Sequence, residues 1–414
     1  MKIAVLTMGC RSNQAESSRI EADLLRGGHD LVVNAADADI FVLNSCTVTS
    51  KADAQCRQMI GKALKAGQRV VVTGCSVQMN KEKLQRAFPS IELFDNDSKH
   101  QIINKIGTAS PKSADSALPV SRHRPIVKVQ DGCDNFCSYC IVPYARGRSR
   151  SREVQAIVDE VNALEESGFN EIVLSGIHLG MYGKDFADRM SLAALIREVL
   201  LKTRMPRIRL SSLEVNELNA ELLEVISEER ICNHLHLPLQ SGSDTILKAM
   251  NRTYAAAEYE AALLTLREKN PALCLGADVI VGFPGESDAL FAETESLIER
   301  LPLSYLHVFS YSRREGTPAA TMRGQVSESI KKARSRKLRD AGVQKQQSFI
   351  QSRIGKTESA LVEAADAREC RAMTGNYIKV VIPSKKQINK GSLVTVQLVE
   401  AFGNFASAHA VNGE

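Results

Sequence analysis

The 414-residue sequence has no apolar run long enough to cross a membrane, and its first residues, MKIAVLTMGC, lack the pattern of a secretory signal. One lysine precedes a short apolar stretch there, which is more typical of a first β-strand. The chain also has no strong internal repeat and no low-complexity segment. We therefore expect a cytoplasmic protein of two or three globular domains that does not contact a membrane.

A large net charge is also missing. The formal net charge is only +5, which does not by itself indicate a nucleic-acid partner. The distribution is more informative, because residues 313–353 contain 11 Lys and Arg against 3 Asp and Glu. The densest part, residues 331–339, has a helical pattern. Two interpretations stay open for it: a solvated helix face, or a surface that binds a phosphate backbone.

What the sequence does contain is ten cysteines, six of which form two groups of three. Cytosolic cysteines are normally reduced, so grouped ones indicate metal binding or catalysis rather than disulfides. Three thiolates can hold three irons of a four-iron cluster and leave the fourth iron free for another ligand. The remaining four follow no ligand spacing and are interpreted as buried or helix-borne thiols: Cys56, Cys232, Cys274 and Cys370.

The first group is the CxxxCxxC run formed by Cys133, Cys137 and Cys140, which directly follows a predicted strand at 126–130. Such a loop is short enough to wrap one corner of a cluster. A structural zinc site would need a fourth ligand. The nearest histidine, His123, lies in a presumed linker on the far side of that strand, so zinc is disfavoured.

The second group, Cys10, Cys46 and Cys75, is scattered in sequence, but each cysteine follows a short β-branched strand. These strands alternate with helical patterns at 16–25 and 52–65, which predicts a doubly wound parallel α/β domain over residues 1–108. Ligands of such sheets gather at the carboxyl ends of the strands. The fold is therefore expected to bring the three thiols together.

After a Ser/Ala/Pro-rich linker at 108–124, the strand–helix alternation resumes, and we expect a second domain over residues 120–345. Its six predicted strands favour a partial (β/α)6 barrel with its site at their carboxyl ends: 126–130, 171–176, 207–212, 234–240, 275–283 and 305–312. Residues 352–414 have only short strands and predict a small OB-like β-barrel. The fold class is α/β with this β-barrel appended.

The CxxxCxxC run at the first strand of a partial barrel resembles the radical S-adenosylmethionine (SAM) enzymes. The resemblance implies a [4Fe–4S] cluster on Cys133, Cys137 and Cys140 whose open iron binds SAM, which is cleaved reductively to a 5′-deoxyadenosyl radical. Tyr139 matches the family's contact to adenine. Further candidate SAM contacts end the barrel strands, and each has helix capping as its alternative role: Ser175, Gly176, Ser212, Glu214, Gln240, Ser241 and Asp278.

Nearly the whole chain resembles the methylthiotransferases, on the pieces GC-x-x-NQ, QDGC-x-NFC-x-YCI-x-P-x-ARG and HLPLQSG. That resemblance implies a second, auxiliary [4Fe–4S] cluster on Cys10, Cys46 and Cys75, which carries the sulfur to be transferred. It also implies that the C-terminal barrel is an RNA-binding TRAM domain. The branch acting on N6-threonylcarbamoyladenosine is the most similar, although Arg11 stands where that branch is expected to have lysine.

The implied activity is transfer of a methylthio group to C2 of N6-threonylcarbamoyladenosine, next to the anticodon of tRNA. One SAM methylates the sulfur on the auxiliary cluster, and the radical from a second SAM removes the C2 hydrogen. The alternatives are the same reaction on N6-isopentenyladenosine or on an aspartate of ribosomal protein S12, and a non-catalytic iron–sulfur RNA-binding redox sensor. We expect a monomer, with an electron donor and a sulfur donor of unknown identity.

Four arginines follow the CxxxCxxC loop at every second position: Arg146, Arg148, Arg150 and Arg152. A modified base in a single-stranded loop can be splayed out and read while basic residues hold the backbone. We therefore expect these arginines to bind phosphates near the target base. Surface solvation is the alternative.

Overall fold

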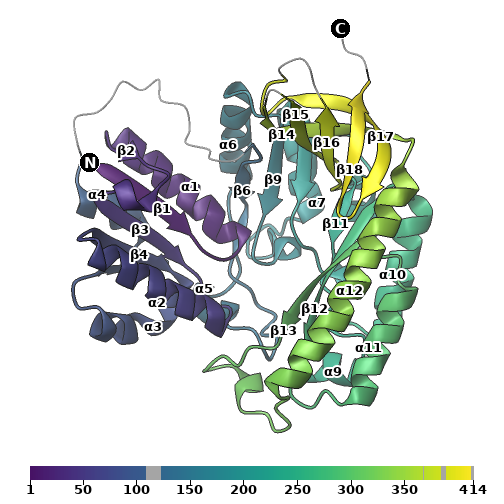
Figure 1. Ribbon diagram of the computed structural model, residues 1–414, viewed down its shortest axis with the longest axis horizontal. Helices are drawn as coiled ribbons and strands as arrows, with labels where there is room; N and C mark the ends of the chain where they lie inside the picture. Colours follow the sequence, from purple (N-terminus) through teal and green to yellow (C-terminus); the bar gives the residue numbers. More distant parts are fainter. Residues whose placement is uncertain (109–122, 367, 384–387, 412–414) are drawn as a thin grey trace.

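The computed structural model describes residues 1–108, 123–366, 368–383 and 388–411, so most of the predicted linker lies outside the described residues. The chain forms an N-terminal α/β domain, a central domain of parallel strands and helices, and a C-terminal β-barrel (Figure 1). This arrangement confirms the predicted fold class. Among the described residues, no helix is long and apolar enough to cross a membrane.

The N-terminal domain is a parallel five-stranded sheet in the order β2-β1-β3-β4-β5. Its strands are β1 (Lys2–Thr7), β2 (Asp30–Leu31), β3 (Ile40–Ser45), β4 (Arg69–Gly74) and β5 (Glu92–Phe94). Its helices are α1 (Arg11–Arg26), α2 (Ser50–Lys65), α3 (Cys75–Ala87) and α4 (Ile102–Ile106). Separate apolar clusters form on the two faces of the sheet, as a doubly wound domain requires. The two edge strands, β2 and β5, are too short to have been recognised from the sequence.

All six predicted strands of the central domain are present and parallel: β6 (Ile126–Lys128), β9 (Glu171–Ser175), β10 (Arg207–Leu210), β11 (His234–His236), β12 (Cys274–Val281) and β13 (Tyr305–Ser310). They form two three-stranded sheets, β10-β9-β6 and β11-β12-β13. A parallel bridge from Ile208 to Ile231 connects the two sheets. Short strands β7 (Gln130–Asp131) and β8 (Arg150–Ser151) pair beside the cysteine loop.

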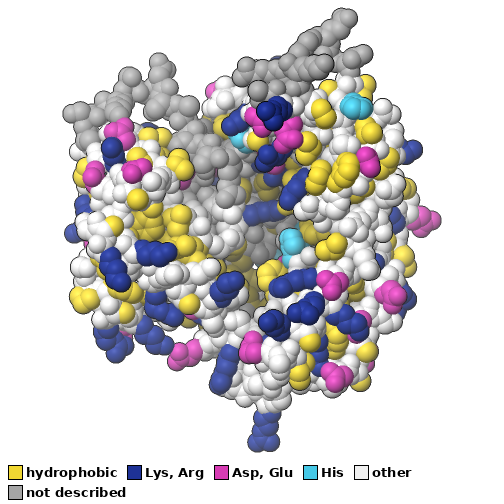
Figure 2. Space-filling view, viewed as in Figure 1, with side chains coloured by type: hydrophobic (Ala, Val, Ile, Leu, Met, Phe, Trp, Pro, Cys, Tyr) yellow, Lys and Arg dark blue, Asp and Glu magenta, His cyan; other side chains and the backbone are white. Residues whose placement is uncertain are grey.

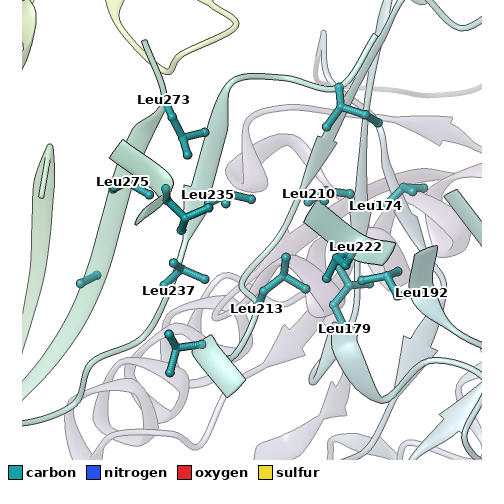
Figure 3. Packing of buried hydrophobic residues seen from close by; sticks show 14 of the residues in the cluster. Leu174, Leu179, Leu192, Leu210, Leu213, Leu222, Leu235, Leu237, Leu273 and Leu275 are labelled. Carbon is teal, nitrogen blue, oxygen red and sulfur yellow. The ribbon is translucent and has the colours of Figure 1, made fainter. Parts of the chain in front are cut away.

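Side chains of the central strands alternate between two environments, as the period of a β-strand requires. One set is apolar and packs against surrounding helices: α6 (Val154–Glu166), α7 (Leu192–Lys202), α8 (Ala220–Val225), α10 (Ala256–Lys269) and α11 (Asp288–Arg300). Leu174, Leu210, Leu235 and Leu237 belong to this set (Figure 3). The alternating set is polar and faces the other side of the strands, which we call the lumen. It includes Glu171, Arg209, His234, His236 and Asp278.

The basic segment forms α12 (Glu328–Arg353), which packs along β13 and continues to the C-terminal barrel. Part of its charge is paired with carboxylates of the central domain. Arg334 is buried and pairs with Glu286 at 2.6 Å, and Lys337 pairs with Glu295 at 2.6 Å. The positive charge of the segment therefore gives less free surface for phosphates than its composition indicates.

The C-terminal domain is a closed barrel in the order β14-β15-β16-β18-β17. Its strands are β14 (Thr357–Ala365), β15 (Glu369–Thr374), β16 (Lys379–Pro383), β17 (Leu393–Phe402) and β18 (Phe405–Ala410). Arg209 donates to the carbonyl oxygens of Gly375 and Thr374 at 3.0 and 3.1 Å. The Tyr377 ring stacks on His234 with centroids 4.4 Å apart. The turn between β15 and β16 therefore closes one end of the lumen.

Candidate two-cluster active site

Cys10, Cys46 and Cys75 directly follow β1, β3 and β4 at the carboxyl edge of the N-terminal sheet. The approach of these chain ends depends on two glycines with positive φ, Gly9 and Gly74. A Cβ on Gly9 would lie 2.8 Å from Cys46 Sγ, and one on Gly74 would lie 2.3 Å from the carbonyl oxygen of Ser45. A larger residue at either position would push the cysteines apart.

The three thiols affect one another electrostatically. Burial, with smaller contributions from the neighbouring Cys75 and Cys10, raises the pKa of Cys46 to about 11. Burial also raises the pKa of Cys75, against the opposing charges of Arg146 and Lys99. A thiol must lose its proton to bind a metal. The two cations are therefore placed to stabilise a ligated thiolate at Cys75.

Neither triplet is spaced for a single ion. Among the described residues, the one group of three metal-binding side chains with all ligand atoms within 4.8 Å of one another is His236, Asp278 and His307. In an iron–sulfur cluster each thiolate binds a different iron, so its sulfurs stand farther apart than the ligands of one ion. A [4Fe–4S] cluster on each triplet is what the family resemblance implies, and it stays a prediction.

The second triplet, Cys133, Cys137 and Cys140, occupies the loop between β7 and α5 (Val142–Arg146). Gly132 precedes it with φ +73°, and a Cβ there would lie 2.0 Å from the carbonyl oxygen of Arg148. Burial raises the pKa of Cys140 to about 12. A partly buried thiol such as Cys140 needs positive charge nearby to bind a metal as thiolate.

Two cations contact the other two thiols of this triplet. His178 Nδ1 lies 3.6 Å from Cys133 Sγ, and its Nε2 lies 2.6 Å from Glu217 Oε1. Burial alone would lower the pKa of His178, but its hydrogen bonds to Cys133 and Glu217 raise it to about 10. Arg252 Nη1 lies 3.4 Å from Cys137 Sγ. Both sulfurs are therefore contacted by groups that are protonated at neutral pH.

Four of the candidate SAM contacts lie near the second triplet or its partners. Glu214 pairs with Arg252, which contacts Cys137. Tyr139 packs in a small apolar cluster with Phe283. Ser175 is buried at the end of β9, and Gly176 follows it, where a Cβ would lie 2.7 Å from Gln130 Oε1. Tyr139 lies within the loop that is expected to hold SAM, and Glu214 is connected to it through Arg252.

The remaining candidates have other surroundings. Ser241 is buried and bonds locally, with its Oγ 3.2 Å from Thr294 Oγ1. Gln240 is buried with φ +64°, and Ser212 is exposed. Asp278 Oδ1 lies 2.9 Å from His236 Nε2. Glu214 also has the alternative role of a helix cap, because it caps a short 3-10 helix.

Asp278 is part of a chain of polar groups along the lumen. Its Oδ1 also lies 3.3 Å from Nδ1 of His307, which is half exposed. On the other side, His236 Nδ1 lies 2.9 Å from the hydroxyl of Tyr305, which lies 2.8 Å from His234 Nε2. The chain connects an exposed imidazole to a buried one over three strands.

The predicted RNA-binding arginines divide into two kinds. Arg148 and Arg150 are exposed, with 73% and 58% of their side chains accessible. Arg152 is partly exposed and pairs with Glu160 at 2.7 Å. Arg146 is only 1% exposed and pairs with Glu16 and Asp131. Because its guanidinium is buried between two domains and already paired with two carboxylates, phosphate binding by Arg146 stays a prediction that this geometry does not favour.

The arginine–glutamate contact joins the two domains that carry the triplets. Glu16 belongs to α1, which begins directly after Cys10, and Arg146 ends the short helix after Cys140. Arg146 also donates to Asn13, whose amide group donates to the carbonyl oxygens of Met8 and Ser45 beside the first triplet. A hollow lies between the N-terminal domain and the rest of the molecule, with Lys and Arg side chains on both sides (Figure 2).

Sequence reasoning missed several residues of this site: Glu16, His178, Glu217, His236, Arg252 and His307. One of them stood inside a piece that the resemblance used, since His236 is the first residue of HLPLQSG, and Arg252 follows that piece in the sequence. Their roles depend on contacts between strands far apart in sequence. No local spacing signals such contacts.

Comparison with known proteins gives two family matches. The Radical SAM superfamily matches residues 127–298, and the uncharacterized protein family UPF0004 matches residues 2–95. The chain is 36% identical to a threonylcarbamoyladenosine tRNA methylthiotransferase of Aquifex aeolicus, over 94% of this chain and 98% of the relative. It is 34% identical to a tRNA-2-methylthio-N(6)-dimethylallyladenosine synthase of Syntrophus aciditrophicus, over 100% and 94%.

Solved structures are similar in fold. The radical SAM methyltransferase TsrM of Kitasatospora setae, solved with cobalamin and a [4Fe–4S] cluster, matches with a TM-score of 0.56 and 14% identity over 77% of each chain. The cobalamin-dependent radical SAM enzyme OxsB matches with a TM-score of 0.51 and 13% identity, over 77% of this chain and 54% of that one. At these identities the similarity concerns the fold alone.

Proposed function

The chain belongs to the methylthiotransferase family of radical SAM enzymes, and from that membership we propose that it adds a methylthio group to C2 of N6-threonylcarbamoyladenosine in tRNA. The observation that carries the proposal is the presence of two cysteine triplets, one per domain, linked by the buried contact between Arg146 and Glu16. A reaction that needs both a sulfur source and a radical needs two such sites near one substrate. Membership of the radical SAM superfamily implies SAM and one [4Fe–4S] cluster.

In this proposal Cys133, Cys137 and Cys140 hold the SAM-binding cluster, and Cys10, Cys46 and Cys75 hold a second cluster that carries the sulfur. When bound at its cluster, SAM supplies on one-electron reduction the radical that removes hydrogen from an unactivated carbon. The residues around the cysteines neutralise the thiolates and cover the cysteine loop. His178 and Arg252 neutralise the thiolates of Cys133 and Cys137, and Tyr139 with its apolar neighbours covers the loop.

The proposed RNA contacts are Arg148, Arg150 and Arg152, together with the C-terminal barrel. Arg148 lies over the Phe136 ring with 4.8 Å between its guanidinium carbon and the ring centroid, so the side chain is held beside the cysteine loop. Exposed arginines at this place can hold the backbone on either side of a base that has turned into the lumen.

The test separates the two triplets in reconstituted protein. Cys137→Ala is expected to abolish formation of 5′-deoxyadenosine, whereas Cys46→Ala is expected to retain it and to block methylthiolation of tRNA. Cys56→Ala, a buried thiol on α2, is the matched control and should retain both activities. Modification that survives both triplet substitutions would contradict the division of labour.

The isopentenyladenosine substrate is the second candidate, because a relative with that named activity is 34% identical. Mass spectrometry of tRNA nucleosides from a strain lacking the protein decides between the two. Loss of 2-methylthio-N6-threonylcarbamoyladenosine with accumulation of its precursor supports the first. Loss of the methylthio-isopentenyl nucleoside supports the second.

A further inference from the structure

A cavity of about 400 Å³ has Arg11, the residue after Cys10, in its lining, and none of the residues assigned above to the clusters or to SAM lines it. It is lined by the start of α1, by β6, β9 and β10 of the central domain, and by the C-terminal barrel, and it is open to solvent on one side. Its charged walls are Arg11, Arg124, Arg209 and Glu363. Tyr377 supplies an aromatic wall.

The charges in and around this cavity do not balance. Arg209 and Arg207 share the buried carboxylate of Glu171, at 2.9 and 2.7 Å. Arg124 pairs with Glu363 at 2.6 Å. Together with Arg11, these make four arginines against two carboxylates, Glu171 and Glu363, in this part of the described chain. A buried region with excess positive charge is suited to an anion.

Arg11 is the cation without a carboxylate partner in this group, since the described residues give it no ion pair. Its charge extends into the lumen. Burial lowers the pKa of His234, and the charges of Arg209, His236 and Arg11 lower this pKa further. Arg11 also follows Cys10 directly, so any group bound by Arg11 lies close to the first triplet.

We propose that Arg11 binds the carboxylate of the threonylcarbamoyl group on the target adenosine, and that this cavity selects an acidic modified base over an apolar one. The inference rests on the proposed function, and in it Arg11 determines which modified base the enzyme accepts. Around Arg11, Tyr377, Ile126 and Val173 provide the apolar contact that the rest of the side chain needs. An isopentenyl group would leave the guanidinium desolvated and unpaired, which is costly.

A phosphate of the RNA backbone has the same anionic chemistry and is the alternative source. Three anticodon stem-loops distinguish the two sources: one with N6-threonylcarbamoyladenosine, one with the methyl ester of the same group, and one with plain adenosine. The ester removes only the negative charge. Wild-type protein is expected to bind the acid at least about 10-fold more tightly than the ester, as for a charge-assisted hydrogen bond. Equal binding of acid and ester would overturn the proposal.

The protein-side test is Arg11→Gln. It is expected to remove the preference for the acid over the ester and to leave binding of the unmodified stem-loop unchanged. Arg11→Lys should restore part of the preference because it keeps the charge. Arg26→Gln, at the exposed far end of α1, is the matched control and should behave as wild type. If Arg11→Gln weakens all three RNAs equally and lowers the salt dependence, the partner is a phosphate and the proposal is wrong.

This failure is distinguishable from failure of the proposed function. If wild-type enzyme methylthiolates the threonylcarbamoyl stem-loop but does not discriminate the ester, only the role of Arg11 is wrong. If it modifies none of the stem-loops and acts on an isopentenyl RNA, the proposed substrate is wrong as well. The iron content of Arg11→Gln, compared with that of wild type, tests whether the adjacent Cys10 still holds its cluster.

Discussion

Arg146 Nη1 lies 2.8 Å from Glu16 Oε1, in a contact that joins the central and N-terminal domains. The same carboxylate is 2.8 Å from Lys128 Nζ and is also paired with Lys99, and Arg146 is 2.9 Å from Asp131. Because Glu16 follows Cys10 on α1 and Arg146 follows Cys140 on α5, this network connects the chain segments next to the two triplets.

Arg146→Met is therefore expected to destabilise the protein by about 3–5 kcal/mol, since it leaves buried carboxylates without a partner. Urea denaturation followed by circular dichroism measures this. Arg150→Met, four residues on and 58% exposed, is the matched control and should change stability by less than about 1 kcal/mol. Equal effects of the two substitutions would show that the network does not hold the domains.

The stability of the folded protein should also depend on pH, because Glu16 is protonated in acid. Its burial would raise the carboxyl pKa, but Lys99, Arg146 and Lys128 together hold it well below the ordinary value of 4.5. A group whose pKa is depressed in the folded state stabilises the protein above 4.5, and this stabilisation is lost as pH falls from 4.5 toward the folded pKa. The urea midpoint of wild type should fall more steeply below pH 4.5 than that of Glu16→Gln. Parallel curves would contradict this coupling.

Gly74→Ala tests the approach of the strand ends to the first triplet. Its Cβ would collide with the carbonyl oxygen of Ser45 and displace Cys75 from Cys46. Iron bound per chain should drop while 5′-deoxyadenosine formation at the second triplet remains. Gly107→Ala is the matched control, because Gly107 has a similar backbone (φ 91°, ψ 169°, against φ 98°, ψ −171°) but open space around it. A similar loss of iron in Gly107→Ala would mean that backbone strain alone is responsible.

Replacing Arg148 and Arg150 by Gln should weaken tRNA binding and flatten its salt dependence, by about 0.7–0.9 in the slope of log affinity for each lost phosphate contact. A salt titration of binding measures both. Arg300→Gln, exposed on α11 and paired with Glu260, is the control. Unchanged binding of the double variant across the titration would count against the phosphate role.

Much of the fold and site could be predicted from local sequence. Strands such as 40–45 and 171–175 are short, β-branched-rich and bounded by turn residues, so their alternation with helices was visible. The first triplet could be predicted because parallel strands place their carboxyl ends at one edge. The second could be predicted from its CxxxCxxC spacing alone. The burial of Arg146 was not visible, since every second residue of that run is an arginine and nothing local separates an exposed one from a buried one.

By itself, the sequence determined the order of strands and helices, the two groups of cysteines and the family to which the chain belongs, because these depend on residue type and spacing along the chain. Tertiary structure alone decided which cation lies against which thiol or carboxylate. His178 reaches Cys133, Arg252 reaches Cys137, and Arg11 lines a cavity with Arg209, each across a large separation in sequence. Charge pairing depends on distance and burial in space, and neither is encoded in local periodicity.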